Sequence, residues 1–154
     1  MKRSAYGWRV CAVVALVNFS LLAQQAPIGS STKSAITAEM IGRKYPPMKL
    51  DVAAKDADYG YSEKMPVLVG GGFGGGSENT YRYLNALLGP KSEIVHYDRI
   101  GTCCSFKTNN SPFGDSALLE VFEIRFDGGP PKQLYFNWYD SGKLLIPVGL
   151  TARK

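Results

Sequence analysis

The sequence predicts an α+β domain in which an antiparallel sheet of about four to five strands carries one main helix on one face. Three observations predict this class. Only the stretch 78–88 shows the 3.6-residue apolar period of an amphipathic helix. From residue 94 onward the apolar period is 2, which is typical of strands. Turns rich in Gly, Pro, Asn and Asp separate these strand-like runs.

The helix is the first element that the pattern defines in detail. Ser77 is a suitable N-cap, and Gly89-Pro90 would end the helix. One face of the stretch carries Thr80, Tyr83, Leu84, Leu87 and Leu88. We expect this face to pack on the sheet, above Phe122, Ile124, Phe136 and Trp138.

The strand-like runs alternate apolar and polar residues, and Gly101 is a suitable place for a bend or bulge. The last run contains a proline, which favours an edge strand. The runs are Pro66–Val69 before the helix and 94–100, 103–106, 118–126, 134–138 and 144–148 after it.

Residues 1–23 have the features of a cleavable signal peptide. A basic start precedes the apolar run Val10–Leu22, which is too short to span a bilayer, and Ala23 offers a small residue for cleavage. We expect an exported protein, periplasmic or extracellular, that begins at Gln24 and has no membrane span once mature. The alternative is an uncleaved anchor.

Cleavage would change the charge and the cysteine content. The whole chain has 18 Lys and Arg against 13 Asp and Glu, a net charge of +5, and three basic residues lie in 1–23. The mature net charge is then +2, without a basic run, so we expect no nucleic-acid site. Beyond the signal we expect a polar linker over 24–64 and a single domain over 65–154.

Several blocks of the sequence resemble blocks of known proteins. They are Asp58–Lys64, Glu78–Leu87, Gly101–Phe106, Leu118–Glu123 and Asn137–Asp140 with Pro147–Gly149. In these blocks the chain resembles one group of small exported bacterial proteins that are commonly labelled 2-dehydro-3-deoxyphosphooctonate aldolase. The enzyme of that name is a (β/α)₈ barrel, and such barrels need about 200 residues or more. We therefore expect no such activity from residues 65–154.

The glycine-rich stretch Gly70–Gly76 lies between a strand and a helix and contains the motif Gly-x-Gly-x-x-Gly. The strands that follow do not alternate with helices, as a dinucleotide-binding fold requires, and no Lys-Ser/Thr pair makes it a P-loop. A small acidic ligand could still bind the helix N-terminus, at Gly74, Gly75, Gly76 and Ser77. The simpler interpretation, which we favour, is a flexible connection.

The usual catalytic patterns are missing from the sequence. The only histidine, His96, shares a strand face with Asp98 at a spacing that suits a surface ion pair. Glu120 and Glu123 would lie on opposite faces of one strand. We therefore expect no catalytic site, no metal and no cofactor.

Two tyrosines, Tyr135 and Tyr139, share the strand face opposite Phe136. An aromatic outer face can bind a partner or a glycan. Alternatively, Tyr59 and Tyr61 of the linker could cover it.

Cys103 and Cys104 are the only thiols of the mature chain and are a candidate redox or disulfide pair. Neighbouring Cα atoms lie 3.8 Å apart, whereas ordinary disulfides span about 4.4–6.8 Å. Three states remain open: a vicinal disulfide, two free thiols on opposite strand faces, and disulfides between two chains.

These patterns together predict a cell-envelope protein that acts by binding or structural association, with an envelope protein or a glycan as its unknown partner. One alternative is a thiol-redox or other enzymatic role centred on Cys103–Cys104. The other is an inhibitor or immunity-type binder of an envelope or secreted enzyme.

Overall fold

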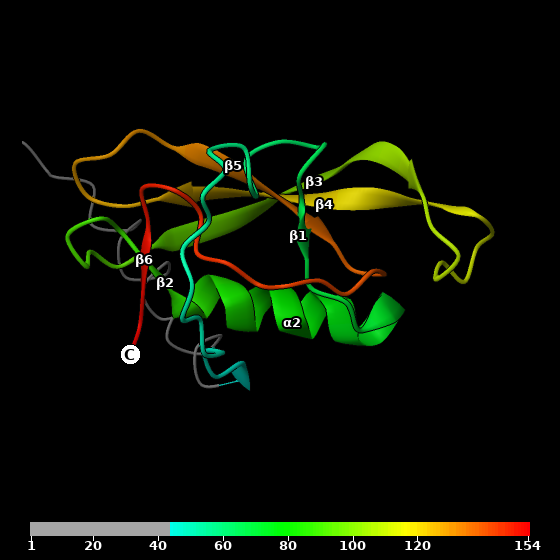
Figure 1. Cartoon of the computed structure of the whole chain (residues 1–154), viewed down its shortest axis with the longest axis horizontal. Helices are drawn as coiled ribbons and strands as arrows, with labels where there is room; N and C mark the ends of the chain where they lie inside the picture. Colours follow the sequence, from blue (N-terminus) through cyan, green and yellow to red (C-terminus); the bar gives the residue numbers. More distant parts are fainter. Residues whose placement is uncertain (1–43) are drawn as a thin grey trace, which may run out of the picture.

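The computed structural model describes residues 44–154, so the signal peptide expected at 1–23 lies outside the described residues. Within them one helix and six strands form (Figure 1). Their bounds are β1 Val67–Leu68, α2 Gly72–Ala86, β2 Leu87–Leu88, β3 His96–Lys107, β4 Ser116–Arg125, β5 Lys132–Asn137 and β6 Thr151–Ala152.

The predicted α+β class is confirmed. Four strands form one sheet in the order β1-β5-β4-β3, in which β3, β4 and β5 are antiparallel neighbours. The short strand β1 pairs parallel with β5, so the sheet is mixed rather than purely antiparallel. A second, two-stranded sheet of β2 and β6 was not predicted. Figure 1 shows α2 lying along one face of the large sheet.

The core lies between α2 and the sheet, as the apolar periods predict. Phe122, Ile124 and Phe136 are at most 1% exposed beneath Tyr83 and Leu84 of the helix. The ring of Phe136 meets those of Tyr83 and Phe122 edge to face, with centroids 5.7 and 5.6 Å apart. Such aromatic pairs add to the stabilisation that burial provides.

The predicted start of the helix is wrong, because the glycine stretch is itself helical. The N-cap is Gly71, whose φ of 93° is a left-handed conformation that glycine adopts without strain. The Asn79 side chain donates hydrogen bonds to the carbonyl oxygens of Val69 and Gly70 and so ties α2 to the preceding chain. Gly72–Gly76 is therefore no flexible connection, and Ser77 lies inside the helix.

The polar linker expected over 24–64 does not reach residue 64. Leu50, Ala54 and Tyr59 are buried members of the core, so the described part of this segment belongs to the packed domain. The Tyr59 hydroxyl donates to the carbonyl oxygen of Lys143 and accepts from the amide of Leu145. The apolar residues of this segment are too widely spaced to show a period.

The edge strand expected over 144–148 does not form. This segment makes only an isolated parallel bridge, between Ile146 and Ala53, and Pro147 is fully buried. The Ile146 amide donates to the carbonyl oxygen of Val52 and its carbonyl oxygen accepts from the Ala54 amide, so this segment pairs with the chain around residue 53 and not with the four-stranded sheet. Among residues 44–154, no helix is long and apolar enough to cross a membrane.

Candidate functional site

The helix covers only part of its face of the sheet. Along β4, Phe122 and Ile124 point toward α2, and Glu120 and Leu118 continue the same face because alternate strand residues share a face. Figure 1 shows the β3–β4 hairpin extending past the N-terminal end of α2. A stretch of the inner sheet face is thus left without a helix above it.

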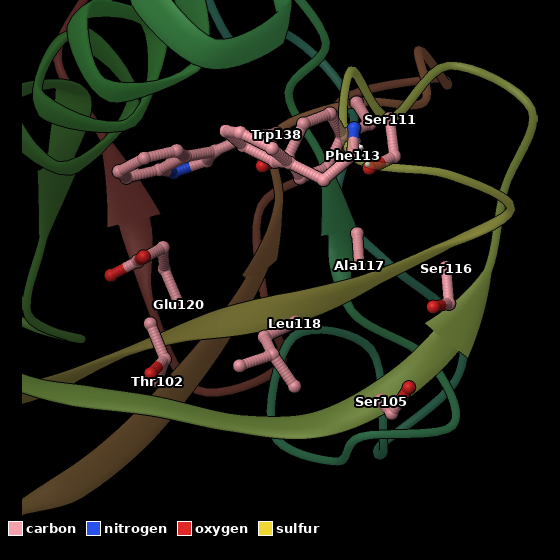
Figure 2. A pocket seen from close by; sticks show the side chains of 10 residues that line it. Thr102, Ser105, Ser111, Phe113, Ser116, Ala117, Leu118, Glu120 and Trp138 are labelled. Atoms are coloured by element: carbon pink, nitrogen blue, oxygen red, sulfur yellow. Dashed lines mark hydrogen bonds between the residues drawn. The ribbon is translucent and has the colours of Figure 1, made fainter.

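A groove of about 370 Å³ occupies this stretch, and we call it the hairpin groove (Figure 2). Figure 2 shows Trp138, Glu120 and Thr102 toward one end and Ser105, Ser111 and Ser116 toward the other. The residues that line it come from β3, β4, the loop between them and the segment after β5. They are Thr102, Ser105, Ser111, Phe113, Ser116, Ala117, Leu118, Glu120, Trp138 and Tyr139.

Glu120 is the charged residue of the groove, and it is only 6% exposed. Arg99 of β3 donates a hydrogen bond from Nε to Glu120 Oε2 over 2.6 Å, and this bond raises the pKa of the guanidinium. Within the described part of the chain, Oε1 of Glu120 accepts no hydrogen bond. Among the described residues the one buried side-chain oxygen or nitrogen without a partner is the hydroxyl oxygen of Ser62, so Oε1 of Glu120 is open to the groove and can accept a hydrogen bond from a ligand.

The indole of Trp138 is held in place by the helix. Its Nε1 donates to the hydroxyl of Thr80 over 3.0 Å, and that hydroxyl donates to the carbonyl oxygen of Gly76. A Cβ at Gly76 would collide with the Cβ of Trp138, so glycine here allows α2 to approach the indole closely. The glycine stretch therefore positions an aromatic wall of the groove.

Asp140 fixes the loop that forms the far side of the groove. Its Oδ1 accepts hydrogen bonds from Thr108 and Asn110, at 2.7 and 2.8 Å, and its Oδ2 accepts one from Asn137, at 2.8 Å. Burial alone would raise the pKa of Asp140, but these three bonds together lower it. One carboxylate thus joins the β3–β4 loop to the end of β5.

Cys103 and Cys104 form a vicinal disulfide, one of the three states that the sequence left open. The pair lies at a bulge of β3, where Cys104 has a φ of 57°, an uncommon conformation for a residue other than glycine. The flanking residues Thr102 and Ser105 both line the hairpin groove. The disulfide therefore lies in β3 between two residues that line the groove.

The predicted ligand-binding residues are only partly brought together. Gly74, Gly75, Gly76 and Ser77 lie within α2, after its first residue, so the helix begins before them and not at Ser77. The two tyrosines separate, which corrects the expectation of one shared aromatic face. Tyr139 lines the groove, whereas the Tyr135 hydroxyl donates to Gln133 outside it.

The covering of this face by the linker tyrosines does not take the expected form either. The carbonyl oxygen of Gly60 accepts a hydrogen bond from the Tyr135 amide, and the Tyr61 hydroxyl donates to the carbonyl oxygen of Val148.

The predicted His96–Asp98 ion pair is wrong, because Asp98 pairs with Arg125 on the neighbouring strand.

Sequence reasoning missed Glu120, Arg99, Trp138 and Phe113 as site residues. A signal for Glu120 was present, because it is a carboxylate on the otherwise apolar face formed by Leu118, Phe122 and Ile124. Trp138 was expected in the core and is half-buried at its edge.

Comparison with family models, curated proteins and solved structures finds no match to this chain.

Proposed function

We propose that this chain is an exported protein of the cell envelope that acts by binding a partner in the hairpin groove, without catalysing a reaction. The observation that carries this proposal is the unpartnered oxygen of Glu120, which lies at an open groove with aromatic walls. Concave sites with apolar walls and a few placed polar groups are the usual form of binding sites.

The groove lining supports binding over catalysis. General acid–base chemistry on glycosidic bonds uses two carboxyl groups, and nucleophilic catalysis uses a nucleophile within reach of a base. The lining offers one carboxylate, Glu120, which already accepts a hydrogen bond from Arg99, and it contains no second carboxylate, histidine, lysine or cysteine beside its hydroxyls.

A thiol-redox role is the second candidate, and the formed Cys103–Cys104 disulfide favours it. Reduction of this bond takes two electrons and two protons from a dithiol and yields two cysteine thiols. Replacing both cysteines by serine separates the candidates. The binding proposal predicts that envelope binding survives, and the redox candidate predicts that a dithiol-dependent activity disappears.

The binding proposal is tested by co-sedimentation of the processed protein with isolated envelope fragments. Leu118 lines the groove and is 50% exposed, and Ile100 lies outside the lining and is 51% exposed, so they form a matched pair. Leu118→Lys should raise the Kd obtained from co-sedimentation at least about tenfold, equivalent to about 1.4 kcal/mol. Ile100→Lys should leave it unchanged, and equal effects of both variants would contradict the proposal.

The proposed export is tested separately from binding, because the processed protein should carry a defined N-terminus. Intact-mass analysis of the protein recovered from the envelope fraction should give a chain that begins at Gln24. A chain that begins at Met1 in that fraction would contradict export with cleavage.

A further inference from the structure

We propose that the ligand of the hairpin groove is an uncharged saccharide chain. This inference rests on the proposed binding function and names the class of ligand. Three features of the groove support it: its charge balance, its pattern of hydrogen-bonding groups and its aromatic walls.

The charge balance favours an uncharged ligand. Glu120 is the charged residue of the lining, and Arg99 already pairs with one of its oxygens. A lysine or arginine side chain from a peptide would place a second cation beside Arg99, and like charges repel. An anionic ligand would meet the free oxygen of Glu120. A neutral hydroxyl avoids both penalties.

The hydrogen-bonding groups suit a ligand with many hydroxyls. Oε1 of Glu120 can accept a hydrogen bond from a ligand hydroxyl, and hydrogen bonds to a charged group are the stronger kind. Side-chain hydroxyls, which both donate and accept, continue along the groove from this oxygen. They belong to Thr102, Ser105, Ser111 and Ser116.

The aromatic walls suit the C–H faces of sugar rings. Trp138 and Tyr139 follow the end of β5 along the chain, and Phe113 belongs to the β3–β4 loop; all three line the groove. Figure 2 shows the side chains of Trp138 and Phe113 on the same side of the groove. Phe113 is 76% exposed and Leu118 is 50% exposed, so the groove is an open surface rather than a closed cavity. An open groove can accept an internal segment of a chain, whereas a closed cavity would admit only a free monosaccharide.

Trp138 provides a direct probe of this site. The chain has two tryptophans, Trp8 in the signal peptide and Trp138 in the groove, so the processed protein contains one. Its fluorescence should change on titration with neutral oligosaccharides made of glucose or N-acetylglucosamine units. At least one of these series should saturate, and an oligolysine and a polyuronic acid should each bind at least about tenfold more weakly.

Two variants test the named contacts. Glu120→Gln keeps the shape but replaces the carboxylate, and it should weaken saccharide binding about ten- to hundredfold. Thr102→Val removes one exposed hydroxyl and leaves the Arg99–Glu120 pair intact, so it should weaken binding about threefold even if Glu120→Gln does not fold. Ile100→Lys is the control and should bind as the wild type does.

The outcomes separate this inference from the proposed function. Saturable binding of a neutral oligosaccharide that Thr102→Val weakens supports the saccharide. No binding of any neutral series, while Leu118→Lys still abolishes envelope binding, overturns the saccharide and leaves a groove that binds another ligand. If Leu118→Lys also has no effect, both proposals are wrong.

Discussion

Two halves of one sheet face have different surroundings in this protein. Beneath α2, the face carries Phe122, Ile124 and Phe136, and no more than 1% of each is exposed. Toward the β3–β4 loop, the same face of β4 carries Glu120, which is buried against Arg99, and Leu118, which is half exposed. Strands β3 and β4 run through both halves, whereas β5 ends at Asn137, so the groove lies where β5 and the covering helix give way to the hairpin.

The comparison shows how a small domain can keep a stable core and an open site on a single sheet. The covered half gains stability by removing apolar surface from water. The uncovered half keeps polar side chains whose hydrogen bonds an apolar core could not satisfy. Gly76 and Thr80 connect the halves, because they hold the indole of Trp138 at the boundary.

The largest expected effect is the loss of a core ring. Phe136→Ala should lower the free energy of unfolding by about 3–5 kcal/mol, because it leaves a cavity beneath the helix. Leu118→Ala, on the same face beyond the helix, should lower it by less than about 1 kcal/mol. Denaturant unfolding measures both, and equal losses would mean that the two halves of the face do not differ.

The second prediction concerns the boundary between the halves. Gly76→Ala should cost about 1–3 kcal/mol and shift the Trp138 emission, because the added methyl group collides with that residue. Gly74 has open space within 4 Å of an added Cβ. Gly74→Ala should therefore stabilise the protein by up to about 1 kcal/mol. Destabilisation by both variants would contradict the proposed role of Gly76.

The third prediction concerns pH and the loop of the uncovered half. The pKa of Asp140 is lowered in the folded protein, so its contribution to stability is present above the unfolded value and is lost as the pH falls through the folded value. Asp140→Asn should lower the free energy of unfolding by about 1 kcal/mol at pH 7. The free energy of unfolding of this variant should also fall less steeply than that of the wild type below about pH 4. The exposed Asp127→Asn is the control. If Asp140→Asn loses stability below about pH 4 as steeply as the wild type does, Asp140 does not stabilise the folded protein in this way.

The smallest expected effect concerns the disulfide. Replacing Cys103 and Cys104 by serine should change the free energy of unfolding by less than about 1 kcal/mol, because a bond between neighbours closes almost no loop in the unfolded chain. It should weaken ligand binding about threefold, because Thr102 and Ser105 lose the link that fixes their spacing. Unchanged affinity would show that the disulfide does not shape the groove.

The sequence predicted the covered half well and the uncovered half poorly, for a physical reason. Apolar periods identify residues that must be buried, so Leu84, Phe122 and Phe136 were found correctly. The groove depends on where α2 begins, and the glycines before Ser77 look like a loop by propensity. The fit of Gly76 against Trp138 and the hydrogen bond from the Gly72 amide to the Trp138 carbonyl oxygen favour a helix there, and such contacts between distant residues leave no local signal.

The central claim is that the uncovered half of the inner face is the binding site. Amide chemical-shift mapping of the processed, isotope-labelled protein with the best-binding oligosaccharide tests it most directly. We expect shifts at Thr102, Ser105, Glu120 and Tyr139 and at the Trp138 indole, with none at Leu134 under the helix. Shifts at Tyr135 and Gln133 on the opposite face, without shifts in the groove, would contradict the claim.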